Sequence, residues 1–301
     1  MTTAEELPEP KPADRIGTLL GQRYKLLSLL GEGGIGAVFL AEDMQGARGP
    51  GGELPRVAVK LLKRDVADDP TVLARFEREA VAMQALAHEH IVAPLGYGKS
   101  PEGDMCLVME HVDGETLRTM LKRVKQPPLW GVLEIARQIA LGLVRAHGLG
   151  VVHRDLKPEN VMVKWLGEGK PHVKILDFGM ARLLSGVPGT PLTRKGAVFG
   201  TPEYMPPEQA MGQPVDARAD QYAFGVMLFE MIAGGRPFKA KNPLEMLQKQ
   251  IREAPPKLVE LAPGTPPHVQ AAVEKMMAKK PDDRFTDVAS AAAALVDQNW
   301  K

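Results

Sequence analysis

Two short segments of the sequence bring together side chains that could transfer a phosphoryl group. Residues 153–160 read HRDLKPEN and residues 177–179 read DFG. Asp155 can accept a proton from a hydroxyl group, while Asn160 and Asp177 can offer oxygen atoms to a hard metal ion such as Mg²⁺. Lys157 can offset negative charge on the transferred group. These residue types and spacings therefore indicate metal-assisted phosphoryl transfer.

These segments resemble the catalytic loop and the metal-binding triplet of protein kinases. The resemblance continues, motif by motif and in the family's order, from residue 24 to about residue 295. Residues 31–38 (GEGGIGAV) resemble the glycine-rich loop, and residues 57–60 (VAVK) resemble the strand that carries a phosphate-binding lysine. Residues 206–208 (PPE) resemble the end of the activation segment, with proline where alanine is usual. The resemblance implies a two-lobed α+β fold, with a small antiparallel β-sheet lobe that has one main helix and a larger, mainly α-helical lobe.

The resemblance also implies an ATP site. The implied nucleotide-binding residues are Leu30, Gly31, Gly33, Gly36, Val38, Ala58, Lys60, Met109, Glu110, Val112 and Met162. Lys60 would contact the α- and β-phosphates, and Glu79 on the following helix would hold it as an ion-pair partner. The backbone of residues 110–112 would bind the adenine edge, and Met109 would limit the depth of the pocket. Glycine-rich hairpins are common, so the glycine motif gains its meaning from the other motifs.

Several residues indicate the substrate class. Lys157 is typical of serine/threonine kinases, since tyrosine kinases generally carry Ala or Arg nearby, and Thr201 in the substrate loop agrees. Residues 207–210 (PEQA) are typical of the eukaryotic-like serine/threonine kinases of bacteria. The resemblance therefore implies ATP with Mg²⁺ or Mn²⁺ as cofactors, proteins with Ser or Thr acceptors as substrates, and a role in signal transduction.

The activation segment is the predicted site of regulation. Thr193 is the predicted phosphosite, with Thr190 and Ser185 as rival acceptors. Arg154 and Arg182 could converge on a phosphate there. A kinase homodimer that autophosphorylates in trans is a further predicted partner.

Other residues match structural positions of the family. Glu208 and Arg284 match an ion pair that anchors the activation segment, and Asp220 matches a residue that hydrogen-bonds the catalytic-loop backbone. His153 lies close to an aspartate and so suggests a hydrolase, but the resemblance assigns it a packing role under Phe178.

The periodicity of the sequence predicts elements that could position these residues. Residues 24–62 alternate aliphatic and β-branched runs with glycine clusters, which predicts three antiparallel strands. Residues 45–55 hold four glycines and two prolines, which predicts an extended, mobile connection between the second and third strands. Residues 69–86 have helical spacing, and residues 106–110 read as a further strand.

The second part of the chain is helical in pattern. Residues 132–146 carry an apolar stripe, residues 222–232 are apolar nearly all round, and residues 289–294 read as a terminal helix. We therefore predict a flexible tail at residues 1–23, a kinase N-lobe at residues 24–112 and a kinase C-lobe at residues 113–301.

Composition excludes several classes of partner. The 38 Lys and Arg residues nearly balance the 37 Asp and Glu residues, so no overall basic field favours nucleic acid or an anionic membrane. The single cysteine, Cys106, excludes an internal disulfide and suits a reducing compartment. No run of about 18 apolar residues could span a membrane. We expect a cytoplasmic protein, or the cytosolic kinase part of a longer membrane-anchored protein.

Two alternative functions remain open at this point. One is a pseudokinase, which would bind partners without transferring phosphate, although no essential residue is missing. The other is a small-molecule phosphotransferase on a related fold. The long segment between Asp177 and Glu208 favours a protein kinase over that second alternative.

Overall fold

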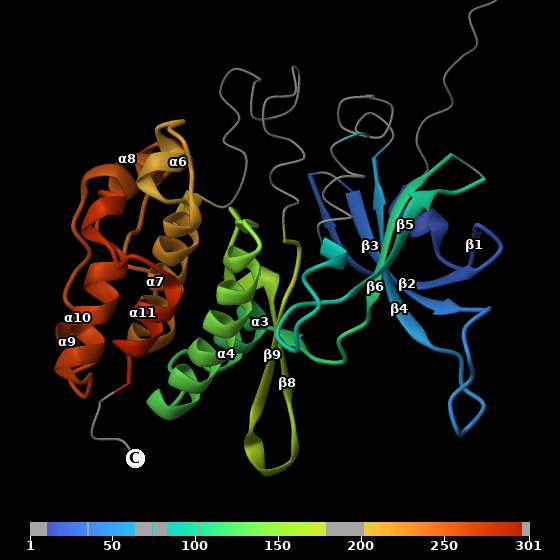
Figure 1. The fold of residues 1–301 in the computed structure, drawn as a ribbon, viewed down its shortest axis with the longest axis horizontal. Helices are drawn as coiled ribbons and strands as arrows, with labels where there is room; N and C mark the ends of the chain where they lie inside the picture. Colours follow the sequence, from blue (N-terminus) through green and yellow to red (C-terminus); the bar gives the residue numbers. More distant parts are fainter. Residues whose placement is uncertain are drawn as a thin grey trace, which may run out of the picture. The chain divides into compact units, whose positions relative to one another are not determined.

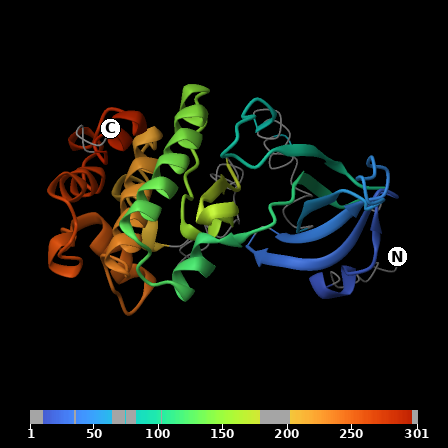
Figure 2. The ribbon, with the colours of Figure 1, turned by 90° about the horizontal axis from the view of Figure 1, so that it is seen from below.

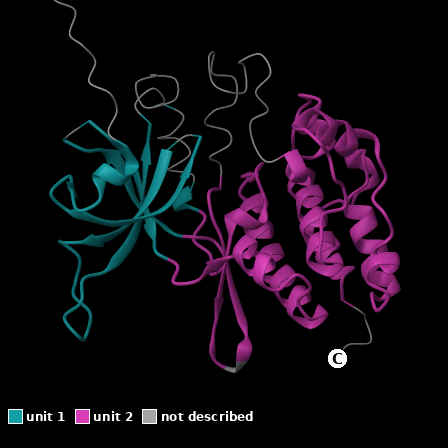
Figure 3. Ribbon diagram, turned by 180° about the vertical axis from the view of Figure 1, so that it is seen from behind, with its two compact units in different colours: residues 1–85, 93–111 teal, residues 86–92, 112–301 magenta. Residues whose placement is uncertain are grey.

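The structure is a computed structural model that describes residues 11–34, 36–63, 74, 83–101, 103–178 and 202–296. The chain divides into two compact units (Figure 3). Unit 1 comprises residues 1–85 and 93–111, and unit 2 comprises residues 86–92 and 112–301. No helix in the described ranges is long and apolar enough to cross a membrane.

Unit 1 is built on a six-stranded antiparallel sheet, which curls as it twists (Figures 1 and 2). Its strands are β1 (Leu19–Leu20), β2 (Tyr24–Gly33), β3 (Gly36–Asp43), β4 (Arg56–Leu62), β5 (Pro94–Lys99) and β6 (Met105–Glu110), in the order β1-β2-β3-β4-β6-β5. Phe39 and Val59 are fully buried in its core. The antiparallel strands predicted over residues 24–62 are confirmed by the β2–β3 and β3–β4 pairings.

The N-terminal segment differs from the prediction. Residues 11–23 do not form a tail: they contain a 3₁₀ turn, η1 (Pro12–Arg15), and strand β1, which pairs with β2. Arg15 forms a bidentate ion pair with Asp104, 89 residues later, in the turn between β5 and β6. The local composition predicted disorder because it contains little apolar surface, whereas the order comes from this distant pair and from burial of Leu20. Residues 1–10 lie outside the described residues.

The connection between β3 and β4 is as long as predicted, but it is closed on itself. The amide of Asp43 donates to the carbonyl of Pro55 and the amide of Gly49 donates to that of Glu53, each at 2.9 Å. Gly52 supplies the left-handed residue of the turn, with φ +85°. The prediction of a connection longer than a simple hairpin turn is therefore confirmed, although the glycine content did not show that its two arms pair.

Unit 2 is mainly helical. Its elements are β7 (Glu115–Thr116), α3 (Leu117–Arg123), α4 (Leu129–Gly148), η2 (Pro158–Asn160), β8 (Val161–Trp165), η3 (Gly167–Gly169), β9 (Pro171–Ile175), η4 (Pro202–Tyr204), α6 (Pro207–Ala210), α7 (Ala217–Ala233), α8 (Pro243–Arg252), α9 (Leu258–Leu261), α10 (Pro267–Met276), η5 (Pro281–Asp283) and α11 (Val288–Ala293). Strands β7, β8 and β9 form a small antiparallel sheet.

Helix α7 is the centre of unit 2. Every residue from 219 to 232 is buried, as the apolar run of the sequence predicts, and α4, α10 and α11 pack around it (Figure 1). Gly225 permits the close approach of α10, because a Cβ at this position would lie 2.8 Å from the Cβ of Met276. The predicted stripe on residues 132–146 is buried on α4. The predicted terminal helix corresponds to α11.

The segment that follows the predicted helix at 69–86 belongs to unit 2. The amide of Val92 donates to the carbonyl of Ile175, and the amide of Ile175 donates to the carbonyl of His90, so residues 90–92 lie along β9. The predicted N-lobe range of 24–112 did not anticipate this insertion of residues 86–92 in the other unit. Most of the predicted helix itself lies outside the described residues.

Candidate active site

The carboxylate of Asp155 is the centre of the site in unit 2. Its Oδ2 atom accepts a hydrogen bond from the Nζ of Lys157 at 2.7 Å and a second one from the Nδ2 of Asn160 at 3.3 Å. The same amide nitrogen donates to the backbone carbonyl of Asp155 at 2.8 Å. Among the described residues, the other carboxylate oxygen, Oδ1, makes no hydrogen bond. One face of the carboxylate is thus held and the other is left for a further donor.

The backbone that carries Asp155 is held by Asp220, in the first turn of α7. The two oxygens of Asp220 accept from the amides of His153 and Arg154, each at 2.8 Å. Asp220 is 1% exposed and also contacts the Nε2 of His147 at 2.8 Å. Arg154 has φ +67°, a left-handed conformation that is unfavourable for a residue with a side chain. Tertiary contacts therefore hold the loop in a shape that its local sequence disfavours.

His153 has a packing role in the structure. Its ring stacks edge-on against Phe178, with centroids 4.8 Å apart. Its Nδ1 accepts from the amide of Asp155 at 3.3 Å, and its Nε2 donates to the carbonyl of Leu176 at 2.8 Å. Both ring nitrogens are therefore engaged with backbone groups, which does not suit the hydrolase base that a histidine close to an aspartate suggests.

Asn160 and Asp177 offer the oxygen donors that a hard divalent ion needs. Asn160 is 8% exposed, and because its Nδ2 is bound to Asp155, its Oδ1 is the amide atom that can serve as a ligand. The amide of Leu176 donates to the carbonyl of Asn160 at 2.9 Å, which ties the residue before Asp177 to the catalytic loop. Across the described ranges, no group of three or more His, Cys, Asp or Glu residues forms a metal site. The donor set thus fits Mg²⁺ or Mn²⁺, which take part of their coordination from phosphate and water, better than a closed structural site.

Unit 1 holds the predicted phosphate-binding lysine. Lys60 lies on β4, 5% exposed, in register with Val38 on β3 and Leu107 on β6. Ala58, two residues earlier on the same face, pairs with Met109, which is buried on β6. Leu30, on β2, is half exposed. Strand pairing thus brings Val38, Lys60, Ala58 and Met109 to one part of the sheet.

The three glycines of the glycine-rich loop differ in how much space a side chain would have at each position. A Cβ at Gly36 would lie 1.9 Å from the carbonyl oxygen of Leu61 on β4, so the packing of the sheet itself excludes a side chain. Around Gly31 a Cβ would meet nothing within 4 Å, and at Gly33 only one carbonyl oxygen at 3.9 Å. The sheet therefore does not require glycine at positions 31 and 33, which is what a loop that lets a ligand approach its backbone would show.

The predicted adenine-binding residues are partly engaged. The amide of Glu110 donates to the carbonyl of Ala93 at 3.0 Å, and its Oε1 accepts from the amide of Ala93 at 2.8 Å. If Glu110 binds adenine, it must therefore do so through its carbonyl. Val112 and Met162, predicted for the same nucleotide, belong to unit 2, where Met162 lies on β8 opposite Thr116.

Glu208 and Arg284 form a bidentate ion pair in the interior of unit 2. The guanidinium donates to both carboxylate oxygens at 2.7 and 2.8 Å, and the two side chains are 4% and 0% exposed. The guanidinium also donates to the carbonyls of Ala278 and Arg218. Pro206 caps α6 with φ −69°, and its carbonyl accepts from the amide of Ala210. Proline prefers this φ, so the ring restrains the segment without strain.

Several predicted residues lie outside the described residues. They are Glu79, Thr201, Thr193 with its rivals Thr190 and Ser185, and Arg182.

Sequence reasoning missed a buried polar network around Arg118. The Nε of Arg118 donates to Glu159 and its NH1 group donates to Glu230, both at 2.7 Å, and Tyr204 contacts Arg118 and Glu230. Burial, together with the Glu230 carboxylate, raises the pKa of Tyr204. The signal was present in the sequence, because Glu230 is the one charged residue in the apolar stretch 222–232 and so had to find a partner.

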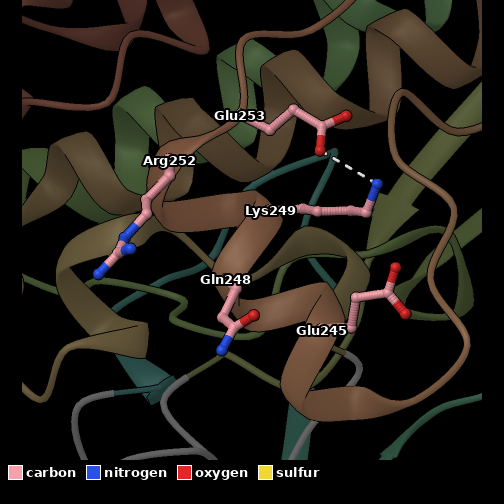
Figure 4. A pocket seen from close by; sticks show the side chains of 5 residues that line it. All are labelled: Glu245, Gln248, Lys249, Arg252 and Glu253. Carbon is pink, nitrogen blue, oxygen red and sulfur yellow. Dashed lines mark ion pairs between the residues drawn. The ribbon is translucent and has the colours of Figure 1, made fainter.

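A separate pocket of about 320 Å³ lies on helix α8, away from these residues (Figure 4). Its lining side chains are charged or polar, and Lys249 and Glu253 pair with each other at 3.0 Å. They are Glu245, Gln248, Lys249, Arg252 and Glu253. The lining contains none of the residues of the candidate site.

Known proteins resemble this chain in sequence and in fold. The model of the protein kinase domain matches residues 24–301. Serine/threonine-protein kinase pkn3 of Myxococcus xanthus is 36% identical over 279 residues, which are 91% of this chain and 50% of that protein. PknA of Mycobacterium tuberculosis is 38% identical over 275 residues, or 90% of this chain and 60% of that protein. The chain therefore belongs to the protein kinase family.

Solved structures agree with this assignment. The crystal structure of the Mycobacterium tuberculosis PknI kinase domain matches with a TM-score of 0.69 at 27% identity, covering 93% of this chain and 97% of that one. The two-lobed α+β fold predicted from the sequence is confirmed. The chain spans 50 to 60% of the length of the pkn3 and PknA relatives. Protein kinase domains in general use ATP and a divalent metal ion, and act on proteins.

Proposed function

We propose that this chain is the catalytic domain of a serine/threonine protein kinase, which transfers the γ-phosphate of ATP to Ser and Thr hydroxyls of proteins and also autophosphorylates its activation segment. The observation that carries the proposal is the arrangement at Asp155, where Lys157 and Asn160 hold Oδ2 and no described residue occupies Oδ1. The bacterial relatives that match the chain are themselves named serine/threonine-protein kinases.

Asp155 acts as the base on the protein substrate. The Ser or Thr hydroxyl donates to Oδ1, and its oxygen attacks the γ-phosphorus as its proton passes to the carboxylate. The bond between the γ-phosphorus and the bridging oxygen breaks, and ADP leaves. Lys157, which already contacts the carboxylate, stabilises the negative charge on the phosphoryl group during its transfer.

Asn160 and Asp177 hold Mg²⁺ or Mn²⁺ through their side-chain oxygens. The metal ion supplies positive charge to the phosphates of the bound nucleotide. The chain's own contribution is the fixed direction of these oxygens, since the amide of Asn160 is oriented by its bond to Asp155. Asp177 has φ +57°, a left-handed conformation that sets the direction in which its side chain leaves the backbone.

In unit 1 we assign nucleotide binding to the glycine-rich loop and to the strands behind it. Gly31 and Gly33 let the backbone approach the phosphates, Gly36 closes the loop against β4, and Lys60 binds the α- and β-phosphates with Glu79 as its partner. Leu30, Val38, Ala58 and Met109 contact the adenine, and the carbonyl of Glu110 binds its edge; in unit 2, Val112 and Met162 contribute to adenine binding. Thr201 belongs to the substrate loop, and Glu208, Asp220 and Arg284 keep structural roles.

The wider setting follows from the same chemistry. We propose unit 1 and unit 2 as the two kinase lobes, in place of the ranges 24–112 and 113–301 that the sequence predicts, with a homodimer as the form that autophosphorylates in trans. We propose a cytoplasmic protein, or the cytosolic kinase part of a longer membrane-anchored protein, and the free thiol of Cys106 supports a reducing compartment. The near-zero net charge argues against nucleic acid as a partner.

The decisive experiment incubates the purified chain with labelled ATP and Mg²⁺, alone and with casein as a generic substrate. We expect label on Ser and Thr but not on Tyr, no transfer when the metal is chelated, and no transfer by Asp177→Asn, because charge neutralisation at the phosphates is lost. Unchanged single-turnover transfer by Asp177→Asn would contradict the proposal. Nucleotide binding without transfer by the parent would indicate the pseudokinase alternative. Label found only on small molecules would indicate a small-molecule phosphotransferase.

A further inference from the structure

The peptide group that joins Arg154 to Asp155 is held at both ends by side chains. Its N–H donates to the Nδ1 of His153 at 3.3 Å, and its carbonyl accepts from the Nε2 of Gln209 at 3.2 Å. Both bonds are long for this type of contact. The preceding amides are bound instead by Asp220, at 2.8 Å each. The peptide that precedes Asp155 is therefore held by longer bonds than the two amides before it.

This peptide needs external support because of the conformation of Arg154. At φ +67° the Cβ of Arg154 crowds its own backbone, and the residue stays in this region only if its surroundings hold it there. Asp220 fixes the two amides that precede this bend. The carbonyl that follows the bend has Gln209 as its partner. Gln209 thus supports the side of the bend from which Asp155 leaves.

The two ends of the Gln209 amide differ in their surroundings. Its Oε1 atom is buried and has no hydrogen-bond partner among the described residues. Exchanging the two ends of the amide would set Oε1 against the carbonyl oxygen of Arg154, so the observed orientation is the favourable one. Burial of an unpaired acceptor is unfavourable, and an apolar side chain would avoid it. The fold alone thus gives no reason for an amide here, whereas the bond to Arg154 does.

The backbone of Gln209 is also held on both sides, by contacts of the residues before and after it. The residue before it, Glu208, is bound by both nitrogens of the Arg284 guanidinium in the interior of unit 2. On the other side, the amide of Ala210 donates to the carbonyl of Pro206 at 3.0 Å. The position of the Gln209 backbone is thereby set by the end of the activation segment. A change in that segment would reach the catalytic loop through this side chain.

We propose that Gln209 is a positioning residue for Asp155: its amide fixes the 154–155 peptide plane and couples residues 206–210 to the direction of the catalytic carboxylate. This inference rests on the proposed kinase activity. Misplacement of a catalytic group by about 1 Å can lower a rate roughly 100-fold, so a small rotation of this peptide is enough to matter. The effect of Gln209 is exerted through the carbonyl of Arg154, to which its amide donates.

Gln209→Met tests the proposal because methionine matches the length of glutamine but cannot donate. We expect kcat to fall about 10- to 100-fold while KM for ATP stays within about 2-fold. The melting temperature should stay equal to that of the parent or rise, since the unpaired Oε1 is removed. Gln213→Met is the matched control, because Gln213 is exposed and only its backbone amide is bound, to the carbonyl of Glu208.

The activity of Gln209→Glu should depend on pH in a way that a purely structural role of Gln209 would not cause. An ionised carboxylate repels the carbonyl oxygen of Arg154, whereas a protonated carboxyl group can donate to it. The activity of Gln209→Glu relative to the parent should therefore rise as the pH is lowered from about 8 to about 6.

A measurement that does not depend on activity completes the test. In the parent, the backbone ¹³C′ resonance of Arg154 reports the hydrogen bond on its carbonyl, and we expect it to shift in Gln209→Met but not in Gln213→Met. An unshifted resonance would overturn the proposal, as would an unchanged kcat or a loss of activity that only follows a loss of stability. If the parent itself transfers no phosphate, the proposed function fails, and the resonance still decides whether Gln209 holds the loop.

Discussion

Single residues of the candidate site are held by more contacts than their identities suggest. The Asn160 side chain has two tasks, because its nitrogen binds Asp155 and its oxygen is left for a metal ion. His153 uses both ring nitrogens to bind backbone groups, the amide of Asp155 and the carbonyl of Leu176. Each side chain therefore fixes the geometry of its neighbour, and substitution at one position moves the next.

Asp155→Asn should lower the rate of phosphoryl transfer by several orders of magnitude with little effect on nucleotide affinity. The carboxylate is proposed to act on the acceptor hydroxyl, and an amide cannot accept that proton. Single-turnover transfer and a nucleotide titration on the same preparation check this. Loss of nucleotide binding in Asp155→Asn would show that the residue serves the ligand or the fold instead.

Gly36→Ala and Gly31→Ala should separate the two reasons for glycine in the loop. At Gly36 the added methyl group would overlap the carbonyl of Leu61, so we expect a loss of about 1–3 kcal/mol in the free energy of unfolding. At Gly31 there is open space, so stability should stay close to that of the parent while KM for ATP rises. Urea unfolding and ATP titration of both variants provide the measurement. Equal destabilisation by the two changes would contradict this distinction.

At the scale of elements, ion pairs at different depths differ in what they contribute. Glu208 and Arg284 are buried, whereas Arg218 pairs with Asp216 and Asp282 at the surface. Exposed pairs contribute at most about 1 kcal/mol, because water and salt screen them. The two arginines therefore provide a matched comparison of anchoring in one unit.

Arg284→Ala should lower the free energy of unfolding by about 3–5 kcal/mol, because it leaves the Glu208 carboxylate buried without its partner. Arg218→Ala, in the same unit, should cost about 1 kcal/mol or less. Urea unfolding followed by circular dichroism compares the two. If Arg284→Ala unfolds at the same urea concentration as the parent, the pair does not anchor α6.

The contact of residues 86–92 with β9 and α4 should make stability depend on pH. His90 is buried against His88 and His172. The charged neighbours of His90 are Glu89 and Glu134, and those of His88 are Glu89, Arg145 on α4 and Lys174 on β9. Burial lowers the pKa of both His88 and His90 below the value of about 6.5 that they have in the unfolded chain. At a pH between the lowered pKa of the folded chain and the value of about 6.5 in the unfolded chain, the unfolded chain therefore binds more protons than the folded one.

The free energy of unfolding should therefore fall as the pH is lowered below about 6.5, and should not change through these groups above it. Urea unfolding at about pH 7.5 and pH 5.5 measures the difference. His90→Gln keeps a donor for the carbonyl of Val173 but cannot titrate, so its stability should depend less on pH. An equal dependence in His90→Gln and the parent would exclude His90 as the source.

At the scale of the whole molecule, the two units divide the proposed chemistry. Unit 1 carries the glycine-rich loop and Lys60, and unit 2 carries Asp155, Asn160 and Asp177. The net charge of +1 gives no long-range field to guide a substrate, so recognition must come from local contacts. Regulation of such a molecule would have to act on segments that reach the catalytic loop, and the activation segment is the one that the sequence indicates.

Thr193 should become phosphorylated when the protein is incubated with ATP, and the phosphate should raise activity. Phosphothreonine adds about −1.5 to −2 charges and can make roughly 1–3 charge-assisted hydrogen bonds with Arg154 and Arg182. Mass spectrometry of the parent beside Lys60→Met checks the site, and Lys60→Met should stay unmodified. Absence of phosphate from Thr193, or a Thr193→Ala enzyme as active as the parent, would contradict the switch.

The sequence by itself determined the fold class, the strands over residues 24–62 and the helices α4, α7 and α11. It also predicts Asp155, Asn160 and Asp177 as site residues, because they match family motifs with short, fixed spacings. Periodicity identified α7 since a helix buried on all sides must be apolar all round. These features depend on local order along the chain, which a sequence displays directly.

Only the tertiary structure decided features that depend on residues far apart. Arg15 orders the N-terminal segment through Asp104, Arg118 meets Glu230 across 112 positions, and Gln209 reaches Arg154 across 55. The tertiary structure also showed that packing excludes a side chain at Gly36 but not at Gly31, because the atom that excludes it at Gly36 belongs to another strand. Such contacts leave no periodic trace in the sequence, since the free energy of a buried ion pair or hydrogen bond depends on which distant group the fold brings within reach.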